Sequence, residues 1–209
     1  ASMIPKTGMV KGILNPLLFL KTLNNHLLRS TVAKARHVIT FSNFSKQLVL
    51  DGLGKNYTGK VEVVAPGIDS TWFDVERKSS LDPALLFWGR LEDEKGLPEL
   101  FHALKIVSKI IKDVNLTVVG EGNQLRNYKS LVSDLSLTDR VKFTGWLSSN
   151  KIQNLTAQSS LGLFPSRVES FGLSVVEAMA AGLPVIAATA GAVPENIEGG
   201  VTGTLVPVN

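Results

Sequence analysis

The sequence contains no cysteine, and this absence excludes a disulfide scaffold, a thiol nucleophile and any zinc or iron–sulfur site that depends on thiolate ligands. Its three histidines, His26, His37 and His102, are scattered without the spacing of metal ligands, so we expect no metal site. The apolar stretch Ile13–Leu20 is far shorter than the ~20 residues that cross a bilayer. It also lacks the cleavage pattern of a signal peptide, so neither a membrane span nor a leader is predicted there.

What the chain does contain is typical of a globular protein. Its 209 residues are 44% hydrophobic and 19% charged, which is enough for one large domain or two small ones with a buried core. The charges are unevenly divided. Residues 1–60 hold nine Lys or Arg against the single acid Asp51, whereas residues 61–209 hold thirteen Lys or Arg against seventeen acids. Such asymmetry indicates two parts with different partners.

The basic part predicts an amphipathic helix over residues 16–35, with leucines among lysines and arginines. Two interpretations stay open: a helix packed on a sheet with a solvated basic face, or a helix on an anionic membrane surface. Few aromatic side chains alternate with the basic ones, which argues against a nucleic-acid partner. Strands are predicted at 37–41 and 61–64, with a helix from 42 or 43 to 53 between them. These strands need a further sheet to pair with.

From residue 84 onward, short apolar runs alternate with segments of helical periodicity at 20–30 residues per unit. This rhythm predicts an α/β fold, a Rossmann-like doubly wound parallel sheet with helices on both faces. The expected strands are Ala84–Trp88, Leu116–Val119, Val141–Thr144, Leu161–Phe164, Val185–Ala188 and Gly203–Val206; the expected helices run from Leu97 to Ile111, from Leu125 to Leu135, around Ile152 and Leu155, and from Leu173 to Ala181.

The expected strand order, 3-2-1-4-5-6, opens a crevice beyond the carboxyl ends of strands one and four. Strand one continues into residues 89–96, with the sequence GRLEDEKG. Strand four continues into residues 165–173, with the sequence PSRVESFGL. These are the two most unusual loops of the domain, and the topology places them face to face. A ligand site is therefore predicted between them.

Arg90 and Lys95 are the candidate anion ligands of the first loop. A guanidinium and an ammonium group that converge between two glycines suit a diphosphate. The alternative is a solvated surface pair that the neighbouring acids Glu92, Asp93 and Glu94 neutralise.

In the second loop, Gly172 and Leu173 begin a helix whose first N–H groups point into the crevice, and the missing side chain of Gly172 lets an anion approach. Glu169 precedes this helix. Glu177 lies in its otherwise small and apolar second turn, so it needs a hydrogen-bond donor such as a ribose hydroxyl. The alternative is a rim glutamate paired with a lysine. Two glutamates eight positions apart do not identify a site on their own.

These loops resemble a known family. The segment ESFGLSVVEAMAAGLPVIAATAGAVPENI (169–197) resembles the signature of retaining glycosyltransferases of family 4, which have the two-domain GT-B fold. GRLEDEKG matches their phosphate loop, and VVGEG, VKFTGWL and GTLVPVN stand in the expected order. Two further segments are similar to the end of the preceding domain and to the hinge in this family: ARHVITFSNFSKQLV and VEVVAPGID. The resemblance covers residues from about 30 to 207.

The resemblance implies transfer of a sugar from a UDP-, GDP- or ADP-sugar to a glycan or lipid-linked acceptor, with retention of configuration and without metal or cofactor. Such a mannosyl- or glucosyltransferase would serve polysaccharide or glycolipid synthesis. Arg90 and Lys95 would grip the diphosphate and stabilise the leaving group, and Glu169 would contact the donor sugar; these three are the implied catalytic residues. The implied donor-binding set is Gly89, Arg90, Lys95, Gly145 and Trp146 (beside the base), Glu169, the amides of Phe171, Gly172 and Leu173, and Glu177 (on the ribose).

The resemblance also divides the chain. Residues 1–67 would be the remnant of an amino-terminal acceptor domain with its hinge, 68–83 a linker, and 84–209 the donor domain, truncated at its end. We therefore expect a donor-binding fragment that is inactive alone. We expect it in the cytoplasm, with peripheral membrane contact through its basic part. Gly191-Ala192 departs mildly from the Gly-Gly pair common in the family.

Other functions remain open. One is a sugar-nucleotide epimerase or a glycogen-synthase-like enzyme on the same fold. Another is a non-catalytic nucleotide-sugar-binding subunit that uses residues 1–60 for a partner. The strand at 37–41 and the helix before it would expose apolar surface, which predicts self-association or a companion chain. The donor sugar, its base, the acceptor and the linkage are not encoded in these motifs.

Overall fold

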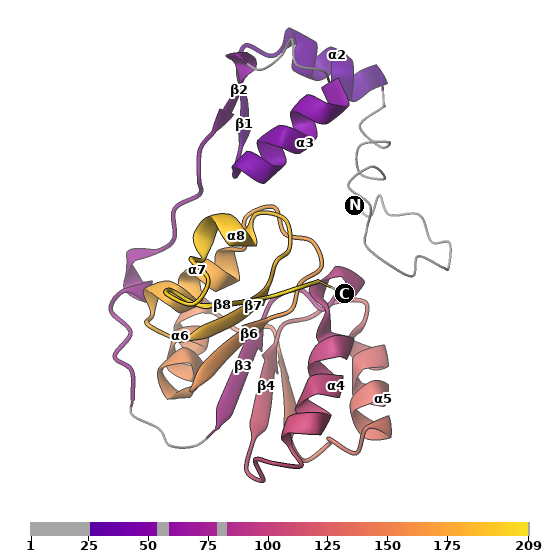
Figure 1. The fold of residues 1–209 in the computed structure, drawn as a ribbon, viewed down its shortest axis with the longest axis vertical. Coiled ribbons are helices and arrows are strands. Elements are labelled where there is room, and N and C mark those ends of the chain that lie inside the picture. Colours follow the sequence, from indigo (N-terminus) through magenta and orange to yellow (C-terminus); the bar gives the residue numbers. More distant parts are fainter. Residues whose placement is uncertain (1–25, 54–58, 79–82, 209) are drawn as a thin grey trace.

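The computed structural model describes residues 26–53, 59–78 and 83–208 (Figure 1). Residues 16–25 of the expected helix over 16–35 lie outside this range, and the described part of that helix is α2 (His26–Lys34). Among the described residues, no helix has the length and apolar character needed to cross a membrane.

A six-stranded parallel sheet forms the centre of the larger part of the chain. Its order is β5-β4-β3-β6-β7-β8, which is the predicted 3-2-1-4-5-6. The four inner strands are mostly buried, as parallel strands covered on both faces require, whereas the two edge strands keep exposed residues such as Lys142, Thr204 and Val206. Their bounds are β3 (Ala84–Trp88), β4 (Asn115–Val119), β5 (Val141–Gly145), β6 (Leu161–Phe164), β7 (Val185–Ala188) and β8 (Thr204–Val206). The predicted α/β fold is confirmed.

Helices cover both faces of the sheet (Figure 1). One apolar core lies between the sheet and the pair α4 (Leu97–Val107) and α5 (Leu125–Asp134), and it is centred on Phe87, Phe101 and Tyr128. The second core lies on the opposite face. Its elements are α6 (Ser149–Gln158), α7 (Leu173–Ala180) and the short α8 (Val193–Asn196). The carboxyl ends of β3 and β6 lie between these layers.

Helix α4 ends earlier than its periodicity predicts. The expected face included Val107 and Ile111, but the helix stops at Val107, and 45% of Ile111 is exposed. The Ser108 hydroxyl donates to the Lys105 carbonyl at 3.0 Å, and such a local contact competes with continuation of the helix. The prediction was wrong for this last turn.

The amino-terminal described part is a small α/β unit. Strand β1 (Val38–Thr40) pairs in parallel with β2 (Val61–Val63), and α3 (Asn43–Leu53) connects them. Ile39 in the middle of β1 is 61% exposed. Figure 1 shows this unit apart from the six-stranded sheet, with the amino end of α3 directed at the larger part.

The segment after β2 does more than connect the two parts. Residues Ser70–Trp72 form a single 3-10 turn, η2, which Asp69 caps by accepting the Thr71 N–H at 2.9 Å. Trp72 is 2% exposed and belongs to the second core. A residue of the expected linker therefore anchors that segment on the larger sheet.

Candidate functional site

The two loops that follow β3 and β6 meet, as the topology predicts. Gly96 has a φ of +65°, and a Cβ added there would lie 2.0 Å from the Pro165 carbonyl oxygen. The Arg167 N–H donates to the Glu94 carbonyl at 2.7 Å. Only glycine permits this approach, because any side chain at position 96 would push the loops apart.

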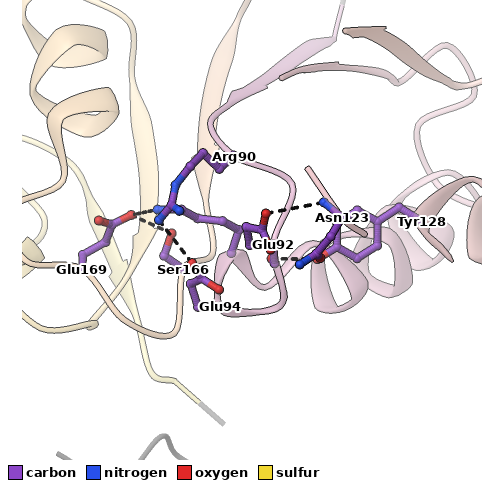
Figure 2. Close-up of polar contacts among 8 residues, drawn as sticks. Arg90, Glu92, Glu94, Asn123, Tyr128, Ser166 and Glu169 are labelled. Carbon is purple, nitrogen blue, oxygen red and sulfur yellow. Dashed lines mark hydrogen bonds and ion pairs between the residues drawn. The ribbon is translucent and has the colours of Figure 1, made fainter. Parts of the chain in front are cut away.

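The contact of greatest chemical interest is an ion pair between the loops. Lys95, in the short turn η3 (Asp93–Lys95), pairs with Glu169, and the two side chains are only 14% and 19% exposed. The Ser166 hydroxyl donates to the same Glu169 oxygen at 3.0 Å (Figure 2). The structure therefore brings Lys95 and Glu169 together, and the carboxylate of Glu169 neutralises the ammonium group of Lys95.

Arg90 does not join this pair. Its side chain is 74% exposed, and its guanidinium lies 3.4 Å from the Glu94 carboxylate (Figure 2). The neighbouring Glu92 is held by α5: its carbonyl accepts from the Tyr128 hydroxyl at 2.9 Å, and its carboxylate lies 3.4 Å from the Asn123 N–H. The loop is thus fixed at Glu92, while Arg90 lies at the solvent edge. The observed geometry of Arg90 is that of a surface pair with a neighbouring acid, the alternative that the sequence left open.

The amino end of α7 lies beside the ion pair. Gly172 has a φ of +90° and precedes the first helical residue, Leu173, which is 46% exposed. Gly172 lines a hollow together with Lys95, Ser166, Glu169 and Trp88. The Phe171 side chain, by contrast, is buried, and its carbonyl accepts from the Asn196 amide at 2.6 Å. Backbone N–H groups at a helix start are suited to an anion that lies in such a hollow.

Glu177 lies one turn into α7 and takes a protein donor. The indole Nε1–H of Trp88 donates to Glu177 Oε2 at 2.9 Å. Burial raises the pKa of Glu177, and this hydrogen bond opposes the rise. Sequence reasoning named the glutamate but not the tryptophan, although Trp88 ends the strand that leads into the first loop.

The remaining predicted residues lie around the rim. Gly89 directly follows β3, and its N–H donates a hydrogen bond to the Val119 carbonyl of β4 at 3.1 Å. Gly145 ends β5, two strands away from β3, with a φ of +73°. Trp146 follows it and is 72% exposed. Its ring is therefore available to a flat ligand.

The backbone of Glu169 and Ser170 is held from two sides. The Ala192 N–H donates to the Glu169 carbonyl at 3.0 Å. The Ser42 hydroxyl, just before α3, donates to the Ser170 carbonyl at 2.7 Å. Ala192 has a φ of −87°, which any residue adopts, so the missing second glycine of the Gly-Gly pair costs no backbone strain.

With this geometry established, comparison with known proteins is informative. The family described as glycosyl transferases group 1 matches residues 69–209. The chain belongs to this family. The sequence resemblance is thereby confirmed at the level of the group 1 glycosyl transferases.

Relatives of this glycosyl transferase have different donors and acceptors in their names. A GDP-mannose-dependent alpha-(1-6)-phosphatidylinositol monomannoside mannosyltransferase of Mycobacterium tuberculosis is 28% identical over 187 residues, which are 81% of this chain and 48% of the relative. A glycogen synthase of the same species is 33% identical over 150 residues, which are 69% of this chain and 35% of the relative. The chain thus spans about half the length of these relatives or less.

The fold agrees with solved structures of GT-B glycosyltransferases. HepE of Anabaena, in complex with UDP-glucose, superposes with a TM-score of 0.79 and 27% identity, over 94% of this chain and 56% of HepE. The likeness therefore extends through the small β1–α3–β2 unit as well as the larger sheet.

Two residues that tie the site of this glycosyl transferase together were missed by sequence reasoning. Arg167 crosses from the second loop to the first: its guanidinium donates to the Asp93 carbonyl at 3.3 Å and pairs with Glu99. Ser166 orients Glu169. Both lie in the loop that the topology singled out, and an arginine opposite an acidic loop was the available signal.

Glu195 was also missed by sequence reasoning, and it joins the two parts of the chain. Its carboxylate accepts from the N–H groups of Asn43 and Phe44 at 2.9 and 2.7 Å, and from the Asn43 side-chain amide at 3.0 Å. It therefore caps the start of α3. Burial opposes ionisation, but these donors together lower the pKa of Glu195 below its ordinary value of 4.5.

We expect Glu195→Ala to loosen α3. The loss of a cap costs about 1 kcal/mol of unfolding free energy, so amide exchange of Asn43 and Phe44 should accelerate. A lowered pKa means that this stabilisation is present above pH 4.5 and is lost as the pH falls through the folded-state value. Glu198→Ala, an exposed acid two residues beyond α8, is the control. Equal exchange in both variants at pH 7 would contradict the cap.

Within the residues that the structure describes, no three His, Cys, Asp or Glu side chains are grouped so that they could hold a metal ion.

Proposed function

We propose that this chain is the donor-binding half of a retaining, family 4 glycosyltransferase, which transfers a hexose from a nucleotide-sugar. The observation that carries the proposal is the meeting of Lys95 and Glu169 in one hollow at the amino end of α7. A partly buried cation, a carboxylate and free helix N–H groups are together the chemistry that a diphosphate and a sugar need. Membership in the family and the UDP-glucose complex of HepE support it.

In the proposed complex, the donor diphosphate replaces Glu169 as the partner of Lys95. Glu169 then accepts hydrogen bonds from hydroxyls of the sugar, and Arg90 turns from Glu94 to the diphosphate. Glu177 accepts from the ribose, and Trp146 borders the base. The exposure of Arg90 and Trp146 is consistent with side chains that move onto a ligand.

In the proposed transfer, the bond between the anomeric carbon and the diphosphate oxygen breaks, and its electron pair leaves with the nucleotide. The acceptor oxygen bonds to the same face of the anomeric carbon, and its proton passes to the departing phosphate oxygen. Lys95 and Arg90 stabilise the negative charge that develops on the leaving group. The acceptor is a glycan or lipid-linked sugar, the classes that the names of the relatives span.

Calorimetric titration of the folded chain with UDP, GDP and ADP tests the proposal. We expect at least one of them to bind, and Lys95→Ala to weaken that binding about 10- to 100-fold, because a charge-assisted contact to phosphate is lost. Lys109→Ala removes an equal charge from an exposed position beyond α4 and should leave the affinity unchanged. Failure of all three nucleotides to bind a folded chain would refute the donor site.

A further inference from the structure

Trp88 is the last residue of β3, and its indole lies at the floor of the candidate site. It is 5% exposed and lines the hollow beside Lys95 and Glu169. Its Nε1–H donates a hydrogen bond to Glu177 Oε2 on α7 at 2.9 Å. One side chain thus contacts both the hollow for the diphosphate and the carboxylate that follows it on the helix.

The indole ring is held so that this donor has one direction. Trp72 stacks on it with ring centroids 5.8 Å apart and an angle of 6° between the planes. Phe164 of β6 meets its edge at 4.9 Å and 83°. Both neighbours are buried. A ring wedged between a stacked and a perpendicular aromatic cannot rotate without disrupting the core.

Glu177 depends on this donor. The side chains three and four positions from Glu177 belong to Leu173, Ser174, Ala180 and Ala181, and Ser174 carries the one hydroxyl among them. Within the part of the chain that the structure describes, Trp88 supplies the hydrogen bond to its carboxylate. Burial raises the pKa of Glu177 and the Trp88 hydrogen bond lowers it, and these two causes account for the shift.

An indole N–H can donate but not accept, so it is matched to a carboxylate acceptor. The contact uses one lone pair of Oε2 and leaves Oε1 and the second lone pair for other donors. A vicinal diol carries two hydroxyl donors, which fit the acceptor sites that remain. Trp88 therefore does two things for Glu177: it orients the carboxylate, and it opposes the protonation that burial favours.

We propose that Trp88 is a positioning residue for the ribose of the donor nucleotide, and that it acts by holding Glu177 as an oriented acceptor for the 2′- and 3′-hydroxyls. This inference rests on the proposed function. Trp72 contributes packing to the stack and no hydrogen bond to Glu177.

The test compares three probes in wild type and variants by calorimetry: the nucleoside diphosphate that binds best, its 2′,3′-dideoxy counterpart, and inorganic pyrophosphate. Wild type should bind the ribonucleotide about tenfold more tightly than the dideoxy form, since a hydrogen bond to a charged group is lost. Trp88→Phe keeps an aromatic ring but removes the donor. It should lose most of this ratio. The affinity for pyrophosphate reports separately any change that the smaller ring causes in the hollow that Trp88 lines.

Trp72→Phe is the matched control, because it removes an indole from the same stack and leaves the Trp88–Glu177 bond in place. It should keep the ribose preference. The pH dependence of ribonucleotide binding is a further readout, which a change in packing alone would not alter. As the pH falls, binding should be lost at a higher pH in Trp88→Phe than in wild type, since Glu177 loses the group that opposes its protonation. An unchanged ribose preference in Trp88→Phe, or an equal loss in both variants, would overturn the proposal.

If Trp88→Phe fails to fold, a measurement on the wild-type chain tests the proposal instead. The indole N–H resonance of Trp88 should shift as Glu177 titrates and on addition of the ribonucleotide, but much less with the dideoxy form. An identical response to both nucleotides would also overturn the proposal. If neither nucleotide binds the wild-type chain, the proposed function itself fails, which is a different outcome from binding without ribose preference.

Discussion

Gly191→Ala should cost about 2–4 kcal/mol of unfolding free energy, which is the range of a backbone clash added to conformational strain. Gly191 has a φ of +55°, where an alanine costs about 1 kcal/mol. An added Cβ would in addition lie 2.0 Å from the Glu169 carbonyl oxygen. The clash can be relieved only by moving the backbone of Glu169 or of Gly191, because neither atom belongs to a flexible side chain.

Gly200→Ala separates the two causes. Gly200 has a φ of +82° but nothing within 4 Å of an added Cβ, so it reports the conformational cost alone, about 1 kcal/mol. Denaturant titration of both variants gives the difference. A variant at position 191 that remains folded should also bind a nucleotide-sugar no better than the free nucleoside diphosphate, since Glu169 is displaced. Equal losses of stability at positions 191 and 200 would show that the close approach to Glu169 is unimportant.

The features that the sequence predicted are those that depend on neighbours along the chain. Apolar runs of four or five residues that alternate with helices indicate a parallel, doubly wound sheet. The chain adopts the common order 3-2-1-4-5-6 of such sheets. The meeting of the loops after β3 and β6 is a consequence of that order, so the place of the candidate site was predictable from Gly89–Gly96 and Pro165–Leu173 alone.

Partner choice within the site was not predictable, since it depends on distances that only the folded chain sets. Lys95 and Arg90 are both cations of one loop, yet only Lys95 reaches Glu169, while Arg90 stays with Glu94. The donor to Glu177 comes from a strand end 89 residues earlier. Glu195 caps a helix that begins 152 residues before it. A pattern along the chain carries no information about such pairs.

The ion pair of Lys95 bears on the affinity of the proposed donor site. In the structure its ammonium group is neutralised by Glu169, so in the proposed function a diphosphate would displace a carboxylate that Ser166 also holds. Both side chains are mostly shielded from water, so this competition is weakly screened by solvent and salt. In the proposed function, breaking this ion pair would therefore lower the affinity of the site for an anion.

Glu169→Gln should for this reason bind a nucleoside diphosphate more tightly than wild type, by about tenfold, because the amide removes the competing negative charge and keeps the shape. The sign is opposite to that of Lys95→Ala, although the two residues form one pair. The same variant should lose the extra affinity for a nucleotide-sugar over the diphosphate, since a neutral amide is a weaker acceptor for sugar hydroxyls. Calorimetry with the diphosphate and its sugar conjugate measures both quantities.

Glu94→Gln is the matched control, because it frees Arg90 in the same way. Arg90 is 74% exposed, so the Arg90–Glu94 pair is worth little and its removal should change the affinity by less than about threefold. Tighter binding in Glu169→Gln but not in Glu94→Gln would assign the effect to the shielded pair. If Glu169→Gln instead weakened diphosphate binding as much as Lys95→Ala does, Glu169 would be orienting Lys95 for the anion, and the exchange of partners on donor binding would be wrong.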